Sequence, residues 1–212
     1  VPTPKRSERV EPRMLIARSF DINKPGAEIE KLVGGVLGGA ILSGKFRVGD
    51  KIELKPGVRS EKKGGQVEWK TVATTITGIS VGSQFVKEGG PGGSVAISTT
   101  LDPAATKQDA FVGAVVGLPG KVPPAVEKLD LKISLFDYVI GTKEKLKIEP
   151  FKQYEPLMIS IGTATTVGII QSAGKSLKLS LKRPVVAQKG DKVAIARQVQ
   201  SRWHLIGFGV VL

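Results

Sequence analysis

The sequence contains no cysteine, a single histidine and few aromatic residues, which make up 5% of the chain. Without cysteine there is no disulfide, no thiolate metal ligand and no cysteine nucleophile. Because His204 is the only histidine, a metal site with two histidine ligands is excluded as well. The chain also lacks the run of about 18 apolar residues that a membrane-spanning helix requires. Residues 1–13 lack the apolar core of a secretory signal. We therefore expect neither a membrane span nor secretion.

Two stretches come close to the phosphate-binding loop G-x-x-x-x-G-K-[ST] without matching it. Residues 39–46 (GAILSGKF) contain both glycines and the lysine, but Phe46 stands where a hydroxyl would hold magnesium. Residues 168–176 (GIIQSAGKS) have an extra residue between the glycines. A working loop opens a helix whose first amides contact the phosphate, whereas each of these stretches runs into a predicted strand. The sequence therefore predicts hairpin turns at both places.

Other signatures of catalysis and ligand binding are incomplete. Residues 106–109 (TKQD) resemble the guanine-reading [NT]-K-x-D of GTPases, but they follow a turn-like segment and no D-x-x-G switch motif occurs. His204 lies in RWHLIG, which predicts a strand, so we do not expect a catalytic triad through it. No calcium loop of the type D-x-D-x-D-G is present. Paired carboxylates of a glycosidase depend on tertiary distance and stay open. We predict no catalytic residue and no metal site.

The charge balance is more informative. The 32 Lys and Arg residues against 19 Asp and Glu give a formal net charge of +13. This excess predicts attraction to a polyanion, most commonly nucleic acid, and a solubilising surface is the alternative. Few aromatic residues argue against sequence-specific RNA recognition by stacking.

Basic residues gather in two segments. Residues 55–70 predict a long hairpin loop, which either follows an RNA backbone or is a solvated tip. Its basic residues are Lys55, Arg59, Lys62, Lys63 and Lys70. Near the C-terminal end, Arg197, Arg202 and Trp203 are candidates for stacking on a base or a partner, or for ordinary hairpin packing.

Alternation of apolar and polar residues predicts an all-β chain. Residues 176–182 (SLKLSLK) and 128–135 (KLDLKISL) place their leucines and isoleucine on one face of a strand, and 26 glycines with 13 prolines separate such segments. A Pro/Gly-rich stretch near residues 117–128 predicts a boundary. We expect two consecutive β-barrels at 13–118 and 125–212, a linker at 119–124 and a further linker at 1–12. Gly-Asp-Lys precedes a strand at 49–51 and at 190–192, which reflects either good hairpin chemistry or common descent of the barrels.

Several stretches together closely resemble the gamma-subunit family of archaeal and eukaryotic translation initiation factor two. They are VPTPKR, MLIARSFDINKPG, GGVLGGAILSGKFRVGD, GGSVAISTTLDP, VVGLPGKVPP, LKIEP, IGTATTVGII, GDKVAIARQV and SRWHLIGFG. The resemblance implies two barrels similar to domains two and three of elongation factor Tu. It also implies that the GTPase domain of the family is absent and that residues 1–12 are the linker from it. Elongation and selenocysteine-specific factors share the barrels, but SRWHLIGFG argues against them.

The resemblance further implies a cytoplasmic factor that delivers methionyl initiator tRNA to the small ribosomal subunit under GTP control. This chain is expected to be non-catalytic and without a cofactor, with GTP and magnesium held by the absent domain. The first barrel is expected to dock the alpha subunit through its loops, including residues 55–70. Through residues 32–39 and 83–93 it is expected to wall the pocket for the tRNA acceptor end. The beta subunit would contact the absent domain. The pocket residues implied are Gly34, Gly35, Val36, Ser83, Gln84, Phe85, Gly92 and Gly93.

Alternatives stay open both for the glycines and for the function of the whole chain. The glycines of 32–39 and 83–93 either let backbone amides approach the acceptor end or only shape bulges at a barrel corner. The resemblance also makes Arg197, Arg202 and Trp203 neighbours of the absent domain. For the whole chain, the competing functions are a general basic RNA-binding β-barrel protein and a GTP-binding protein in its own right.

Overall fold

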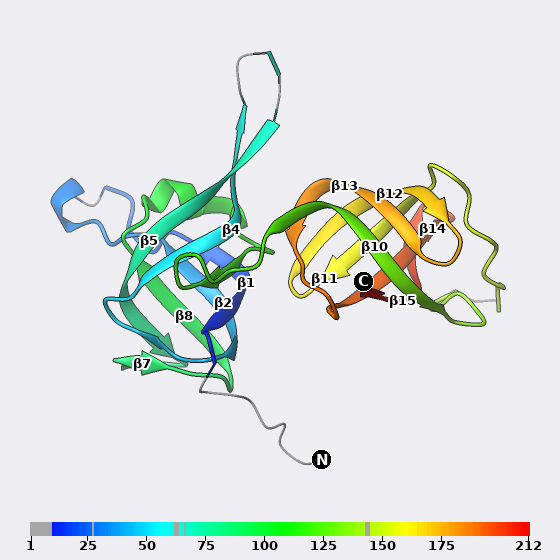
Figure 1. Ribbon diagram of the computed structural model, residues 1–212. Coiled ribbons are helices and arrows are strands. Elements are labelled where there is room, and N and C mark those ends of the chain that lie inside the picture. Colours follow the sequence, from blue (N-terminus) through cyan, green and yellow to red (C-terminus); the bar gives the residue numbers. More distant parts are fainter. Residues whose placement is uncertain (1–9, 27, 62–63, 66, 143–144) are drawn as a thin grey trace. The chain divides into compact units, whose positions relative to one another are not determined.

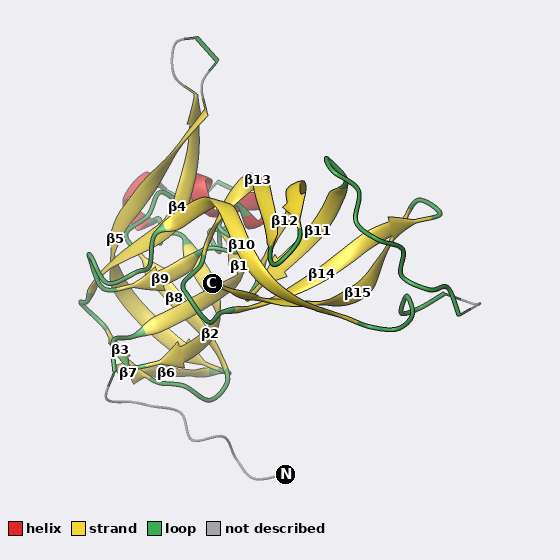
Figure 2. Cartoon of the chain, turned by 45° about the vertical axis from the view of Figure 1, so that its right-hand side comes forward, coloured by secondary structure: helices red, strands yellow, loops and turns green. Residues whose placement is uncertain are grey.

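The structure is a computed structural model that describes residues 10–212 except 27, 62–63, 66 and 143–144. Strands dominate these residues, and the helical segments are the two 3-10 helices η1 (Ile29–Lys31) and η2 (Pro103–Asp109), drawn red in Figure 2. No helix within the described ranges has the length and apolar character needed to cross a bilayer. The chain divides into two compact units between Val122 and Pro123, within residues 119–124. Of the predicted linker at 1–12, residues 1–9 lie outside the described residues.

The first unit is an antiparallel barrel. Its ring runs β4–β9–β1–β2–β8–β5, and β5 pairs with β4 to close it. The short strand β6 extends the sheet from β5, and β3 pairs with β7 beside it. The ring strands are β1 (Arg13–Phe20), β2 (Val36–Ser43), β4 (Lys51–Glu61), β5 (Val67–Val81), β8 (Ser94–Thr99) and β9 (Val115–Gly117). The remaining strands are β3 (Phe46–Arg47), β6 (Gln84–Val86) and β7 (Glu88–Gly89).

The second unit is also a closed barrel, with the ring order β10–β13–β12–β11–β14–β15. Its strands are β10 (Ala125–Leu135), β11 (Pro156–Ile161), β12 (Ala164–Ala173), β13 (Leu177–Val186), β14 (Lys192–Val199) and β15 (Arg202–Val211). The prediction of an all-β chain with two consecutive barrels is therefore confirmed. The strands of the two rings are labelled in Figures 1 and 2.

The alternation in the sequence places the cores as expected, with one exception. Leu177, Leu179 and Leu131 are almost wholly buried in the second barrel. Leu135, predicted to share the inner face with Leu131, is instead 40% exposed. The pairing of β10 with β13 ends at Leu131, and Leu135, the last residue of β10, pairs only with Gly207 of β15. Inner faces therefore follow the pattern of period two until a strand ends.

The repeated Gly-Asp sequence forms the same turn in both barrels. Gly49 and Gly190 both have positive φ, at 96° and 89°. The following carboxylates accept a hydrogen bond from the amide three residues back, Asp50 from Arg47 at 2.7 Å and Asp191 from Gln188 at 2.9 Å. Each turn is also bonded to a facing strand, since the amides of Gly49 and Gly190 donate to the carbonyls of Ile76 and Val211. The two barrels thus share a turn and its contact with the next strand.

We predict that the adjacent glycines of β2 differ sharply in what they tolerate. A Cβ on Gly39 would overlap the carbonyl oxygen of Leu15, whereas a Cβ on Gly38 would make ordinary contacts, 3.6 Å from the Cβ of Arg18. Gly39→Ala should lower the free energy of unfolding of the first unit by about 1–3 kcal/mol, as overpacked sites do. Gly38→Ala should leave it unchanged. Thermal unfolding of the two variants tests this, and equal midpoints would contradict it.

Candidate nucleic-acid interface

Part of the outer surface of three neighbouring strands in the first barrel carries only small side chains. Strand registers align Gly38 of β2 with Ala96 of β8, and Ala96 with Ser80 of β5. We call this surface the small-residue face. Its members are Gly38, Ala40, Gly78, Ser80, Ser94, Ala96 and Ser98.

The small-residue face follows from alternation along each strand. Leu37, Ile97 and Ile79 point into the barrel and are at most 1% exposed, so their neighbours point outward. Packing does not require glycine at position 38, because a Cβ there would meet only ordinary contacts. A surface without long side chains lets a ligand approach the backbone and the serine hydroxyls closely.

Larger residues stand at both sides of the small-residue face. On one side, Arg18 and Phe20 of β1 pair with Gly38 and Val36. The Arg18 side chain is 72% exposed and its Nε lies 3.3 Å from a carboxylate oxygen of Asp109. On the other side, Phe85 of β6 pairs with Ser80 and is 87% exposed. The small-residue face therefore lies between Arg18 and Phe20 on one side and Phe85 on the other.

The structure separates the residues that the sequence assigned to one acceptor-end pocket. Gly34, Gly35 and Val36 lie at the start of β2, where Val36 pairs with Ser98. The other predicted residues lie at the opposite end of this pairing or beyond the far edge of β5. Gly92 and Gly93 precede Ser94, which pairs with Ala40, whereas Ser83, Gln84 and Phe85 lie in or next to β6, where Phe85 pairs with Ser80. The two groups are therefore not neighbours, and the small-residue face lies between them.

The glycines at the start of β2 are explained by packing. A Cβ on Gly34 would overlap the backbone of Thr99, and one on Gly35 would overlap the side chain of Thr106. The Gly35 carbonyl accepts hydrogen bonds from the amide and the hydroxyl of Thr99, at 3.1 and 2.7 Å. The Gly35 carbonyl is therefore already hydrogen-bonded within the barrel. A Cβ on Gly92 or Gly93, by contrast, would meet no atom within 4 Å.

Sequence reasoning missed the centre of the surface, although a signal was present. Every second residue is small in three segments: Gly38 and Ala40, Gly78 and Ser80, and Ser94 through Ser98. That pattern is unusual for exposed strand positions, which ordinarily carry large polar or β-branched side chains. The signal gains meaning only once the three strands are known to be adjacent.

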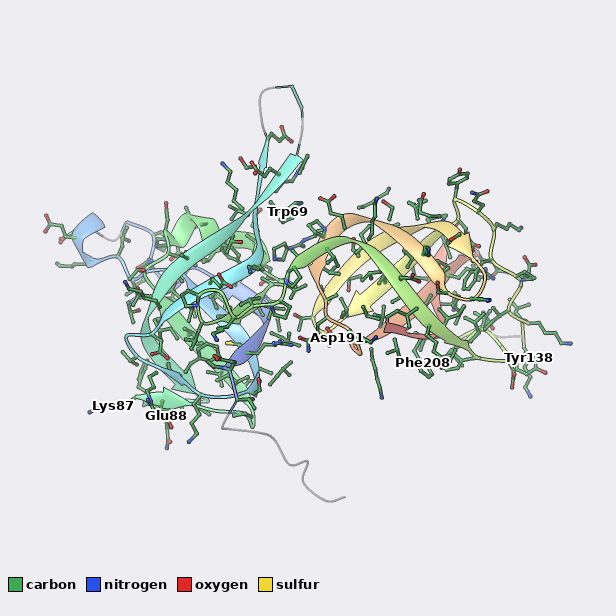
Figure 3. All side chains as sticks on the ribbon, in the orientation of Figure 1. Trp69, Lys87, Glu88, Tyr138, Asp191 and Phe208 are labelled. Carbon is green, nitrogen blue, oxygen red and sulfur yellow. The ribbon has the colours of Figure 1, made fainter. Side chains whose placement is uncertain are left out.

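The predicted long basic loop is wrong in its conformation. Most of residues 55–70 belongs to β4 and β5, which continue past the barrel as a paired hairpin visible at the top of Figure 1. Arg59 pairs with Glu61 at 2.9 Å, and Lys70 is exposed on β5. In Figure 3 this hairpin, near the labelled Trp69, lies at the opposite end of the barrel from Lys87 and Glu88. Lys62 and Lys63 lie outside the described residues.

Lys55 is a structural residue rather than part of a basic surface. Its ammonium donates to the Val122 carbonyl at 3.0 Å and lies 3.3 Å from the Glu53 carboxylate. Burial alone would raise the pKa of Glu53. Hydrogen bonds from the Gly120 amide, the Lys55 ammonium and the Val122 amide outweigh that effect, and the pKa lies below its usual value. The pair fixes the end of the first unit.

Arg197 is buried, as in the packing alternative that the sequence left open for it. It is 8% exposed, and its guanidinium forms an ion pair with Glu155 at 2.6 Å and donates to the Glu149 carbonyl at 2.7 Å. The guanidinium also lies 5.1 Å from the centre of the Phe151 ring. These contacts hold residues 149–155 against β14 and bury the Arg197 guanidinium. Arg202 is exposed and Trp203 half-buried on β15.

Exposed apolar side chains on the second barrel were not predicted. Leu205 is 39% and Phe208 42% exposed on β15, where Figure 3 labels Phe208. Such residues have no sequence signature, because a strand pattern does not show which outer apolar residues stay uncovered.

The residues that resemble nucleotide-binding motifs do not fit GTP. Gly39 lies inside β2, and the turn after Ser43 leads to β3 rather than to a helix. The Asp109 carboxylate, which would read guanine, accepts a hydrogen bond from the Ser19 amide at 3.0 Å and pairs with Arg18. Both stretches therefore serve the packing of the first barrel.

Two sequence features of catalytic sites, a G-x-S-x-G stretch and the histidine, have structural roles among the described residues. Residues 78–82 spell the G-x-S-x-G of a nucleophile elbow, but Ser80 lies within β5, and its hydroxyl donates to the Gly82 carbonyl at 3.1 Å. His204 hydrogen-bonds the Ile140 carbonyl through Nδ1 at 3.0 Å. Within the described parts of the chain, no three His, Asp or Glu side chains gather as metal ligands.

A groove of about 740 Å³ lies beside the small-residue face, between residues 20–32 and η2. Phe20, Leu32 and Pro103 supply apolar walls, and Lys24 and Lys107 line it as well. The loop is held by Asn23, whose side-chain amide donates to the Val33 carbonyl and whose oxygen accepts from the Val33 amide, both at 2.7 Å. Leu32 and Val33 are 42% and 43% exposed. The groove is thus a fixed, partly apolar surface.

Comparison with known proteins gives a consistent family. Residues 127–211 match the family described as "Initiation factor eIF2 gamma, C terminal". The chain is 52% identical over 212 residues to translation initiation factor 2 subunit gamma of Methanocaldococcus jannaschii. The identities to the same subunit of Pyrococcus abyssi and Thermococcus kodakarensis are 49% and 50%. All of this chain is aligned, and it spans about half of each relative, 51%, 51% and 52%.

We predict that Glu53 makes the stability of the first unit depend on pH. Its folded pKa is depressed, so its contribution is complete above the unfolded pKa of about 4.3 and is lost as the pH falls through the folded value. Glu53→Gln should therefore destabilise the protein at neutral pH, and its difference from the unsubstituted chain should shrink below about pH 4. Glu61→Gln, at an exposed ion pair, is the control and should have little effect. Denaturant unfolding at several pH values tests this. A difference that stays constant down to pH 3 would contradict it.

Proposed function

Because the chain belongs to the gamma-subunit family of translation initiation factor 2, we propose that its small-residue face holds the acceptor end of an aminoacylated initiator tRNA. The observation that carries this proposal is the row of Gly38, Ala96 and Ser80 on the outside of three adjacent strands. The family membership also means that the chain is part of a translation initiation factor. The proposal concerns what this part binds.

The chemistry of the small-residue face suits the single-stranded end of a tRNA. A terminal ribose with an esterified amino acid needs room beside the backbone, which glycine, alanine and serine provide. Ser80, Ser94 and Ser98 add hydroxyls that both donate and accept hydrogen bonds. Arg18, at the edge, is placed to contact a phosphate, and the net charge of +13 attracts the RNA from a distance.

The wider role is proposed from the relatives. In this proposal the chain acts without catalysis in the cytoplasm, as part of a factor that brings methionyl initiator tRNA to the small ribosomal subunit. GTP and magnesium are assigned to the half of the relatives that this chain does not span, because residues 39–46 and 106–109 do not fit a nucleotide. The beta subunit is assigned to that same half.

For the alpha subunit, we propose the groove between residues 20–32 and η2 as the docking surface. Leu32 lines the groove and is 42% exposed, and Ile22 and Val33, next to lining residues in the chain, are 51% and 43% exposed. Asn23 hydrogen-bonds both backbone groups of Val33. Docking surfaces of stable complexes commonly have such an apolar centre with a charged rim. Lys24 and Lys107 form that rim, so we expect acidic residues on the facing surface of the alpha subunit.

General RNA binding is the competing function, and one observation favours it. Lysines project from neighbouring strands of the second barrel, and none forms an ion pair with another described residue. They are Lys128, Lys132, Lys178, Lys182 and Lys192. Such lysines bind phosphates without regard to sequence and give a steep salt dependence. A preference for aminoacylated over deacylated initiator tRNA separates the two functions, because lysine–phosphate contacts do not detect the ester.

We predict that filling the small-residue face weakens tRNA binding without unfolding the barrel. Gly38→Val and Ala96→Val add a β-branched side chain that suits a strand but occupies the ligand space. Each should weaken binding of methionyl initiator tRNA about tenfold or more, equivalent to about 1.4 kcal/mol, with an unchanged melting temperature. Ser180→Val, on the outside of β13, is the matched control. Gel-shift titration measures the affinities, and equal loss for the control and the two variants would contradict the proposal.

The docking proposal predicts that a charge placed in the groove weakens binding of the alpha subunit, whereas the same charge elsewhere on the surface does not. Leu32→Asp places a charge at the apolar wall of the groove and should weaken binding of the alpha subunit about 10- to 100-fold, as changes at interface centres do. Val48→Asp introduces the same charge at another exposed valine and should have little effect. Isothermal titration calorimetry with the purified alpha subunit decides between them. The groove is not the docking surface if Leu32→Asp binds as tightly as the unsubstituted chain.

A further inference from the structure

Phe85 of β6 is a large apolar side chain that lies in water on the outside of the first barrel. At 87% exposure it is the most exposed of the large apolar side chains in the described residues, ahead of Tyr154 at 66%. Its neighbour Val86 already packs against the core beside Ile79, so the barrel has no place for the ring. A single exposed apolar side chain is common on protein surfaces, so it is the position of this ring that points to a ligand.

The position of the ring relative to the small-residue face is fixed by strand register. Phe85 pairs with Ser80, Ser80 with Ala96, and Ala96 with Gly38, so all four residues lie in one row on the outer surface. Strands are about 4.8 Å apart, which places Phe85 roughly 10 Å from Ala96 and roughly 14 Å from Gly38. The Phe85 ring therefore stands at one edge of the flat surface that the small residues form.

The surroundings of Phe85 favour RNA over a protein partner. Ser83 and Gln84, which precede it, are exposed and polar, and Lys87 follows it at the end of the barrel (Figure 3). The centre of a protein–protein contact needs several apolar residues together, whereas a base stacks on one ring. A nearby cation adds attraction for the adjoining phosphate.

We infer that Phe85 is a stacking platform for an unpaired base next to the 3′ terminal residue of the RNA that lies on the small-residue face. This inference rests on the proposed function and assigns its ligand a second contact. Stacking on phenylalanine is tolerant of sequence, because every base has a π-face. Phe85 therefore recognises that the RNA end is single-stranded, and the small-residue face is left to recognise the terminal ester.

The test compares two RNAs that differ only in their ends. One is a stem-loop with a short single-stranded 3′ extension, and the other is the same stem-loop with a blunt end. Fluorescence anisotropy with the 212-residue chain gives the affinities at one fixed salt concentration. Phe85→Ala should weaken binding of the extended RNA about 5- to 150-fold, the range for loss of one stacked base. Binding of the blunt RNA should not change.

Two further variants separate stacking from simple apolar contact. Phe85→Tyr keeps a ring and should retain the affinity for the extended RNA, whereas Phe85→Leu keeps apolar area without a ring and should lose it as Phe85→Ala does. An extension with abasic nucleotides should bind the unsubstituted chain as weakly as the normal extension binds Phe85→Ala. Retained affinity in Phe85→Leu overturns the inference and favours a simple apolar contact with the RNA. Equal loss for both RNAs also overturns it.

The inference and the proposed function fail in different ways. If Gly38→Val weakens binding of methionyl initiator tRNA while Phe85→Ala binds the extended RNA normally, only the inference is wrong. If Phe85→Ala behaves as expected but the chain binds aminoacylated and deacylated tRNA equally, the acceptor-end proposal is wrong and the stacking platform stands. If the unsubstituted chain does not distinguish extended from blunt RNA, the inference is overturned whatever the variants do.

Discussion

Hydrogen-bonded closure of each sheet into a barrel is the constraint on which the rest of the structure depends. Once β5 pairs with β4 and β15 pairs with β10, every ring strand has an inside and an outside. The inside must be apolar, because it is the core. The outward-facing residues do not pack in the core, so they need not be apolar and can serve a surface function. In the first barrel that freedom appears as Gly38, Ala96 and Ser80 beside the buried Leu37, Ile97 and Ile79.

Local sequence signals predicted the parts of the fold that local chemistry determines. The alternation in residues 176–182, the Gly-Asp turns and the β12–β13 hairpin at residues 168–176 all depend on a few consecutive residues. The hairpin predicted at residues 39–46 is wrong, because β2 pairs with β1 and β8 while β3, after the turn, pairs with β7. The resemblance to the initiation factor gamma-subunit family was confirmed, and with it the two-barrel fold. These successes share a cause, since positive φ, Asp-to-amide bonds and period two are each properties of short segments.

The remainder of the candidate site depends on residues that are far apart in the chain. Gly38, Ser80 and Ala96 form one row only because β2, β8 and β5 are adjacent, which no pattern in a single strand reveals. For Arg197 the sequence left a partner contact and packing open, because the partners that bury it, Glu149 and Glu155, lie more than 40 residues earlier. Lys55 was expected in a basic loop, yet it bonds the carbonyl of Val122. Tertiary partners, rather than residue type, decide whether such a cation is available to a ligand.

Charge and shape contribute to binding in different ways in this molecule. The lysines on the outside of the second barrel attract any polyanion, and salt screens that attraction. The small-residue face carries little charge, and what it admits depends on the space above the backbone. Under the proposed function, the part of the ligand on the strands is thin and unpaired, because a duplex is too wide to bring a terminal ribose against them. In that proposal the net charge of +13 attracts the RNA, and the small residues Gly38, Ala96 and Ser80 select the part of the RNA that fits.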